Sequence, residues 1–85
     1  MARFDVEVRV MPRPALLDPQ GQAVEHALSA LGFSDVSGVR IGRSVTFRVE
    51  SANAQAAERD ARAMCTKLLA NPVTEDYEIA GVVAA

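Results

Sequence analysis

The most constraining feature of the sequence is a strict alternation of apolar and charged residues near its start. The apolar positions of this run are Phe4, Val6, Val8 and Val10, and a charged residue stands between each pair. A period of two is typical of a strand that buries one face only. This segment therefore predicts a half-buried strand. It ends in Met11-Pro12-Arg13-Pro14, because proline has no N–H to donate to a ladder.

A first helix is predicted to begin at Asp18-Pro19. Aspartate suits the N-cap, where its carboxylate accepts free backbone N–H groups, and proline suits the first helical position. Gly32 supplies the stop. The apolar stripe of this helix comprises Val24, Ala27, Leu28 and Leu31. We expect Leu28 and Leu31 to be buried between the helix and a sheet.

A second helix is predicted from a cap at Asn53 to about Ala70, where Asn71-Pro72 stops it. Its apolar stripe comprises Ala57, Ala61, Met64, Cys65 and Leu68. Leu69 widens the apolar arc at the end of the helix. That end either fills the core or faces another chain.

Further alternating runs predict strands at 39–41 and 45–49, with Gly42-Arg43 as a tight turn between them. A short last strand is expected from about Tyr77 to Val82. The resulting order, β-α-β-β-α-β, predicts an α+β fold in a single domain over residues 1–85. The simplest packing is an antiparallel, split-βαβ-like sheet with both helices on one face. The fourth strand pairs either with its own sheet or with another protomer.

Composition limits the classes of function. The chain has 85 residues, of which 49% are apolar but only 5% aromatic, so its core is thin and burial against a partner would stabilise it. A net charge of −2 without a basic cluster argues against nucleic-acid and membrane-surface binding. The single cysteine, and the absence of a signal-peptide pattern or an apolar run of membrane-spanning length, predict a cytosolic protein.

No set of residues indicates a catalytic centre. The lone histidine, His26, falls on a polar helix face, and Cys65 falls on an apolar stripe, where a buried thiol is expected rather than a nucleophile. The carboxylates of Glu75, Asp76 and Glu78 are expected to form a solvated acidic edge. The sequence contains no Gly-rich phosphate loop, zinc-ligand spacing or Ser-His-Asp set.

Two segments at helix ends are unusual. Gly21 in a first helical turn costs about 0.5–1 kcal/mol relative to alanine, which suggests that something approaches the backbone there. A helix N-terminus also favours anions, and a cap with a tolerated glycine is the simpler alternative. The second segment is the apolar helix end before Asn71-Pro72. From the residues alone, the chain is an α+β module that binds another protein.

The same segments resemble the PurS family. The resemblance rests on Leu17-Asp18-Pro19-Gln20-Gly21, the stop at Gly32, the segment 39–43 and Leu68-Leu69-Ala70-Asn71-Pro72-Val73-Thr74-Glu75-Asp76-Tyr77. These motifs follow one another in order over nearly the whole chain. The resemblance implies the small, non-catalytic, oligomeric subunit of phosphoribosylformylglycinamidine synthase, in purine biosynthesis.

The resemblance also implies partners. In this complex a PurL-like subunit binds ATP and Mg and carries out the synthetase reaction, and a PurQ-like glutaminase releases ammonia with its own cysteine. The small subunit is expected to bind no cofactor, to bridge the two enzymes, to assist ammonia transfer and to form a dimer or a dimer of dimers. The candidate contact residues are Asp18, Pro19, Gln20, Gly21, Asn71, Pro72, Glu75 and Tyr77.

Three alternative functions remain open, and an ACT-type module shares this element order. An ACT-type module that senses a small molecule is the first, since Gly21 at a helix start suits a ligand site. An RNA-recognition module would need exposed aromatic residues on its sheet, and only Phe4, Phe47 and Tyr77 are available on the strands. A small acylphosphatase-like hydrolase would need a convergent polar set, which the sequence lacks.

Overall fold

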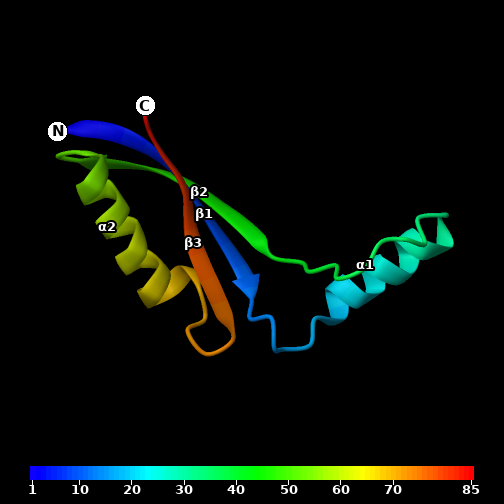
Figure 1. Cartoon of the computed structure of the whole chain (residues 1–85). Helices are drawn as coiled ribbons and strands as arrows, with labels where there is room; N and C mark the ends of the chain where they lie inside the picture. Colours follow the sequence, from blue (N-terminus) through cyan, green and yellow to red (C-terminus); the bar gives the residue numbers. More distant parts are fainter.

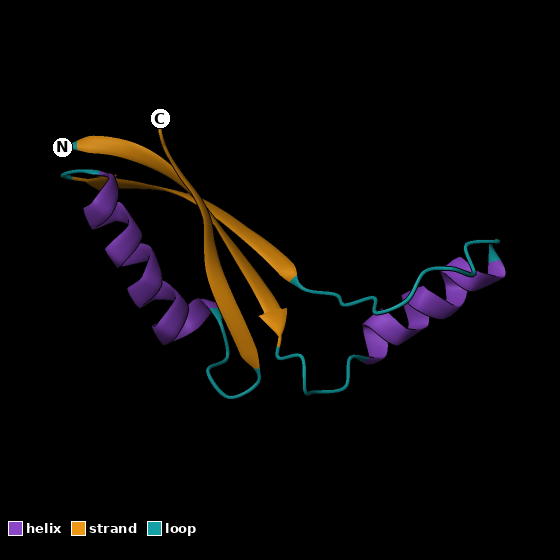
Figure 2. Ribbon diagram, in the orientation of Figure 1, coloured by secondary structure: helices purple, strands orange, loops and turns teal.

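The computed structural model describes all 85 residues and confirms the α+β class with an antiparallel sheet. The elements are β1 (Ala2–Pro12), α1 (Pro19–Ala30), β2 (Arg43–Ser51), α2 (Ala54–Met64), a π-helical turn η1 (Cys65–Leu69) and β3 (Glu75–Ala84). The sheet has three strands in the order β2-β1-β3. Figures 1 and 2 show α2 beside the sheet and α1 beyond one end of it.

The middle strand, β1, supplies the centre of the core. Its apolar residues all point to one face, and the alternation predicted for residues 4–10 is confirmed because each of them is buried. On β2 the facing residues are Val45, Phe47 and Val49, and on β3 they are Tyr77, Ile79 and Val82. These neighbours are only partly buried, since one helix is too narrow to cover three strands.

Helix α2 covers this apolar face. It begins at Asn53, whose side chain accepts a hydrogen bond from the Ala56 N–H at 2.8 Å, as predicted. Ala57, Ala61 and Cys65 are completely buried against the sheet. Their small side chains let the helix approach the valines of β1 closely, which is how a chain without tryptophan fills its core.

The end of this helix corrects one residue of the predicted stripe. Residues Cys65–Leu69 form a π-helical turn, which takes up about one residue more per turn than an α-helix. The extra residue rotates Leu68 into solvent, where 81% of it is exposed, and brings Leu69 towards the core. The sequence could not distinguish the two leucines, because both are equally apolar.

Strand β3 is longer than the predicted segment 77–82. It pairs with β1 along its length, and a bulge opposite Glu7 and Val8 adds one residue on β3. The bulge shifts the alternation, so that Val82 rather than Gly81 lies on the core side with Ile79. β3 therefore pairs within its own sheet.

The other face of the sheet is charged and carries no helix. Ion pairs between neighbouring strands cross it: Arg48 Nε lies 2.8 Å from Asp5 Oδ1, and Arg9 pairs with Glu78. Pairs of this kind between exposed side chains contribute little to stability, but they leave few unpaired charges on the face.

Helix α1 begins and ends as predicted, but it does not lie on the sheet. Asp18 caps it, Pro19 opens it, and Gly32 follows it with a φ of 101°, a left-handed conformation that favours glycine. Leu31 is 74% exposed and Leu28 only half-buried. The expected burial of these two leucines against the sheet is therefore wrong for a single chain.

The segment 39–41 also differs from expectation, because it forms no strand and is not followed by a tight turn. It runs back along α1 and leads directly into β2 (Figure 1). We call residues 13–42 the arm. With the arm extended, the Cα radius of gyration is 16.3 Å, whereas a compact domain of this length has about 12 Å.

Candidate contact surfaces

The first candidate segment, Asp18 to Gly21, holds the arm together. The Asp18 carboxylate accepts hydrogen bonds from the Ile41 N–H at 2.7 Å and from the Gly21 N–H at 3.0 Å. These two bonds, that from Ile41 first, lower the pKa of Asp18. One buried carboxylate thus caps α1 and attaches the returning segment to it.

Gly21 allows this attachment. A Cβ at this position would overlap the carbonyl oxygen of Val39 and lie 2.7 Å from Asp18 Oδ2. The sequence indicated a close approach at Gly21, and the approaching group belongs to the chain itself. Asp18 and Gly21 are buried, whereas Pro19 and Gln20 are exposed. Within a single chain, only the latter two are accessible to a partner.

The second candidate segment, Asn71 to Tyr77, is a loop and the start of β3. Arg43 donates to both oxygens of Glu75, at 2.6 and 2.9 Å, and Glu75 also accepts from the Asn71 N–H at 2.8 Å. The bonds from Arg43, and next that from Asn71, lower the pKa of Glu75 from its ordinary 4.5 to about 2. Tyr77 is half-buried against the core, which leaves Asn71 and Pro72 exposed at the surface.

Two arginines that the sequence did not single out link the segments. The Arg13 guanidinium donates to the Pro72 carbonyl at 2.6 Å, and its backbone N–H donates to the Thr74 carbonyl at 3.0 Å. Arg40 in turn donates to the Arg13 carbonyl at 2.8 Å and to the Leu16 carbonyl at 3.0 Å. Since arginines are scattered evenly through the sequence, no local pattern marked these two.

Each of the other residues considered for catalysis is buried, exposed on α1 or paired with an arginine. Cys65 is buried, and burial raises the pKa of its thiol, which opposes formation of the nucleophilic thiolate. His26 is exposed on α1, as predicted. Each carboxylate of the predicted acidic edge pairs with an arginine: Glu75 with Arg43, Asp76 with Arg13 and Glu78 with Arg9. No group of three His, Cys, Asp or Glu residues is arranged to hold a metal ion, and no helix has the length and apolarity to cross a membrane.

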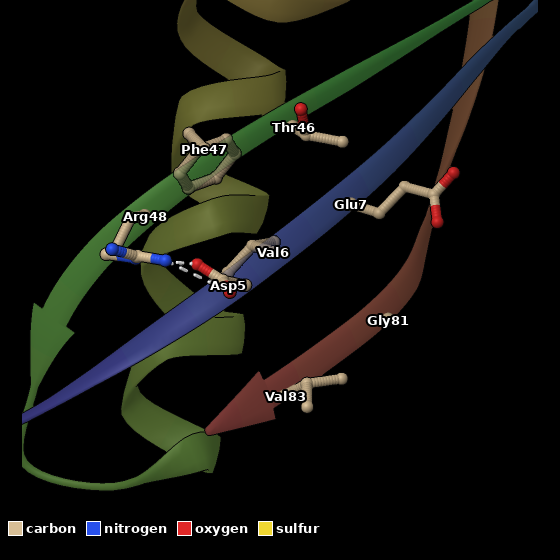
Figure 3. A pocket seen from close by; sticks show the side chains of 8 residues that line it. All are labelled: Asp5, Val6, Glu7, Thr46, Phe47, Arg48, Gly81 and Val83. Carbon is tan, nitrogen blue, oxygen red and sulfur yellow. Dashed lines mark hydrogen bonds and ion pairs between the residues drawn. The ribbon is translucent and has the colours of Figure 1, made fainter. Parts of the chain in front are cut away.

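A shallow hollow on the charged face of the sheet was not predicted (Figure 3). Its lining includes Asp5, Glu7, Thr46, Arg48 and Val83. Arg48 donates to Asp5 there and lowers the pKa of that carboxyl, so the two charges satisfy each other.

A second, apolar groove lies between β2 and α2. It is lined by Val45, Phe47, Asp60, Ala63, Met64, Lys67, Leu68 and Leu69, and we call it the β2–α2 groove. One of the lining residues is Leu68, which the π-helical turn directs outward. The sequence predicted a wide apolar arc at this helix end, and in the structure part of that arc lies at the surface.

Comparisons of the sequence and of the structure with known proteins all identify the same family. The family model described as PurS, phosphoribosylformylglycinamidine (FGAM) synthase, matches residues 5–82. The phosphoribosylformylglycinamidine synthase subunit PurS of Bacillus subtilis is 41% identical over 95% of this chain and 98% of its own. Thermus thermophilus PurS is similar in structure, with a TM-score of 0.85 and 38% identity over 94% of both chains. A chain in the structure of PurLQS from Thermotoga maritima is similar over 100% of both chains, with a TM-score of 0.86 and 32% identity.

Proposed function

Because the chain belongs to the PurS family, we propose that it is the non-catalytic small subunit of phosphoribosylformylglycinamidine synthase, in de novo purine biosynthesis. In this role it bridges a PurL-like synthetase and a PurQ-like glutaminase and assists the passage of ammonia between them. ATP and Mg bind to the synthetase, and the subunit itself binds no cofactor. The complex works in the cytoplasm. Family membership favours this function over the ACT-type sensor.

The full-length likeness to a chain of PurLQS carries the proposal. PurLQS is a complex of PurL, PurQ and PurS, and the likeness extends over the arm as well as the sheet. The buried, protonated thiol of Cys65 supports a non-catalytic role, because a glutaminase nucleophile must be accessible and ionised. The function therefore lies in the surfaces of the chain.

The decisive experiment is reconstitution with a PurL-like synthetase and a PurQ-like glutaminase. Activity is measured with glutamine and, separately, with an ammonium salt as nitrogen donor. Omission of this chain should abolish most of the glutamine-dependent activity and reduce the ammonia-dependent activity less, because coupling is lost while synthetase chemistry remains. Full glutamine-dependent activity without the chain would overturn the proposal.

Point variants test which surface makes the contact. Gln20→Arg and Pro72→Arg place a long charged side chain at exposed positions of the two candidate segments. We expect each variant to fold and to weaken coupling to glutamine. Thr46→Arg, also at an exposed position but on the charged face of the sheet, is the matched control. A loss of coupling only in the control would move the contact surface to that face.

A further inference from the structure

All hydrogen bonds between the arm and the rest of the chain are made by one residue, Arg13. Its backbone N–H donates to the Thr74 carbonyl at 3.0 Å, and its guanidinium donates to the Pro72 carbonyl at 2.6 Å. Both acceptors belong to residues 70–74, the loop that joins η1 to β3. The start of the arm is therefore tied to a loop that lies 59 residues further along the chain.

The start of the arm is itself held in place. Arg40 donates to the carbonyls of Arg13 and Leu16, and the Leu16 N–H donates to the Arg13 carbonyl at 3.0 Å. The Asp18 carboxylate accepts from the Ile41 N–H at 2.7 Å. Residues 13–18 are thus fixed against the returning end of the arm.

The loop on the other side of the anchor has bonds of its own. The Asn71 side chain accepts from the Val73 N–H at 2.9 Å, and the Asn71 carbonyl accepts from the Glu75 N–H at 2.8 Å. Arg43 donates to the Leu69 carbonyl at 2.6 Å, just before the loop. The two candidate segments, at the start of the arm and in this loop, therefore keep a fixed position relative to each other.

The exposed side chains of these two segments carry no charge. Within residues 14–20 and 71–74 the one charged residue is Asp18, which is buried, although 24% of all residues in the chain are charged. Leu17 is 82% exposed and Val73 is 76% exposed. We use the name uncharged patch for the exposed residues Leu17, Pro19, Gln20, Asn71, Pro72 and Val73. Charged residues are depleted in the same way at the centre of protein–protein interfaces.

The patch is small enough for one interface. A standard interface buries about 800 Å² on each partner, which is a disc roughly 30 Å across. Leu17 follows Arg13 by four residues, a stretch of chain that spans at most about 14 Å. Val73 directly follows the residue whose carbonyl Arg13 binds. A protein that binds one segment therefore reaches the other, and a surface fixed before binding loses little conformational entropy.

We infer that the uncharged patch is one docking surface for one protein partner. The inference rests on the proposed function and makes it more specific, because both segments then bind the same enzyme of the complex. The matching surface of that enzyme is apolar and carries no charge at its centre. Arg13 is a positioning residue, which holds Leu17 and Val73 at the spacing that this surface requires. The other enzyme binds elsewhere on the chain.

The first test identifies the neighbour of each segment in the assembled complex. A photoreactive benzophenone amino acid replaces Leu17, Val73 or, as the control, Val83, which is 64% exposed on the opposite face of the sheet. Each chain is reconstituted with a PurL-like synthetase and a PurQ-like glutaminase and then irradiated. We expect positions 17 and 73 to crosslink to the same enzyme, and position 83 not to crosslink to it. Crosslinks to two different enzymes, to neither enzyme, or only to a second copy of this chain would overturn the inference.

The second test measures the patch by titration. The measured quantity is the concentration of this chain that gives half of the glutamine-dependent activity. Leu17→Asp and Val73→Asp should each raise it by at least about tenfold, because each buries an unpaired charge in the interface, whereas Val83→Asp should leave it unchanged. Unchanged values for both patch variants would refute the docking surface.

The role of Arg13 is tested in the same titration. Arg13→Gln leaves every residue of the patch in place and should still raise the half-activity concentration. In a chain that already carries Val73→Asp it should have a smaller effect, since residues that act through one another are not additive. Arg48→Gln, which removes an arginine from an exposed ion pair on the sheet, is the control. Equal effects of the two arginine variants, or full additivity with Val73→Asp, would exclude a positioning role.

The two proposals fail in different ways. If the wild-type chain restores glutamine-dependent activity and the patch variants restore it at the same concentration, the docking surface is wrong and the proposed function stands. If the wild-type chain restores no activity, both are wrong.

Discussion

At the scale of single residues, two glycines of the arm and two carboxylates determine how this chain is shaped. Gly21 and Gly42 each stand where a backbone carbonyl oxygen passes too close for a side chain. Asp18 accepts hydrogen bonds from the backbone N–H groups of Gly21 and of Ile41, which is distant in sequence. Glu75 accepts one from the backbone N–H of Asn71, in the turn before β3. The sequence analysis named three of these residues as contact candidates, and the structure shows that each also makes a contact within the chain.

Substitution of Gly21 should test this internal role. We expect Gly21→Ala to destabilise the chain by about 1–3 kcal/mol, as overpacking of a close contact does, because its Cβ would overlap the Val39 carbonyl oxygen. Gly81→Ala is the control, since no atom lies within 4 Å of a Cβ there. Urea unfolding at one fixed protein concentration measures both. Equal stability of the two variants would show that the backbone approach at Gly21 is unimportant.

The carboxyl of Glu75 predicts an acid-dependent loss of stability. Its pKa is held at about 2 in the folded chain, below its ordinary 4.5, so the unfolded chain takes up the proton first as the pH falls. The stabilisation is complete above pH 4.5 and is lost between there and pH 2. Glu75→Gln should remove this part of the pH dependence of the unfolding free energy, and Arg43→Gln should reduce it, because the Asn71 N–H still donates to Glu75. A wild-type slope in both variants would contradict the assignment.

At the scale of elements, sequence patterns correctly predicted the features that depend only on neighbouring residues. The alternation of β1, the caps of both helices and the stop at Gly32 agree with the structure, because each depends on neighbours within a few residues. The π-helical turn and the bulge in β3 were not predictable. At each site two adjacent apolar residues compete for the core, Leu68 with Leu69 and Val82 with Val83, and only packing selects between them.

The cap of α2 is the clearest prediction at this scale. Asn53→Ala should cost about 0.5–2 kcal/mol, because it leaves the Ala56 N–H without its 2.8 Å acceptor. Asn53→Ser should restore most of the loss, since serine also caps helices well. Thermal unfolding followed by circular dichroism measures both changes. If serine failed to restore the stability, the asparagine would have a role beyond capping.

At the scale of the whole molecule, the place of α1 was the largest error of the sequence-based prediction. The stripe of α1 and the two-helix pattern were identified correctly, and both fit a sheet. Nothing in a sequence distinguishes a helix that covers its own sheet from one that covers the sheet of another copy. The arm is instead fixed by contacts at Asp18, Arg40 and Gly42, which act between segments distant in sequence.

Leu28→Ala therefore has a different expected result from that of a buried core residue. If Leu28 were buried between α1 and the sheet of its own chain, the substitution would lower the free energy of unfolding by about 2–5 kcal/mol at any protein concentration. With α1 apart from the sheet, we expect a cost of that size only where the chain self-associates, so the melting temperature of the variant should approach that of the wild type on dilution. His26→Ala, exposed on the same helix, is the control and should change little. A concentration-independent loss would place Leu28 in a core of its own chain.

A single copy of the chain is too thin to enclose a tunnel for a small molecule such as ammonia. The Cα atoms span 51 × 27 × 14 Å, and the core consists of one three-stranded sheet covered by one helix. Side chains occupy the space between two such layers, which are about 10 Å apart. A tunnel with walls on all sides has no room inside this chain. Any sheltered route for ammonia must therefore run along a seam, with this subunit as one wall and a neighbouring subunit as the other.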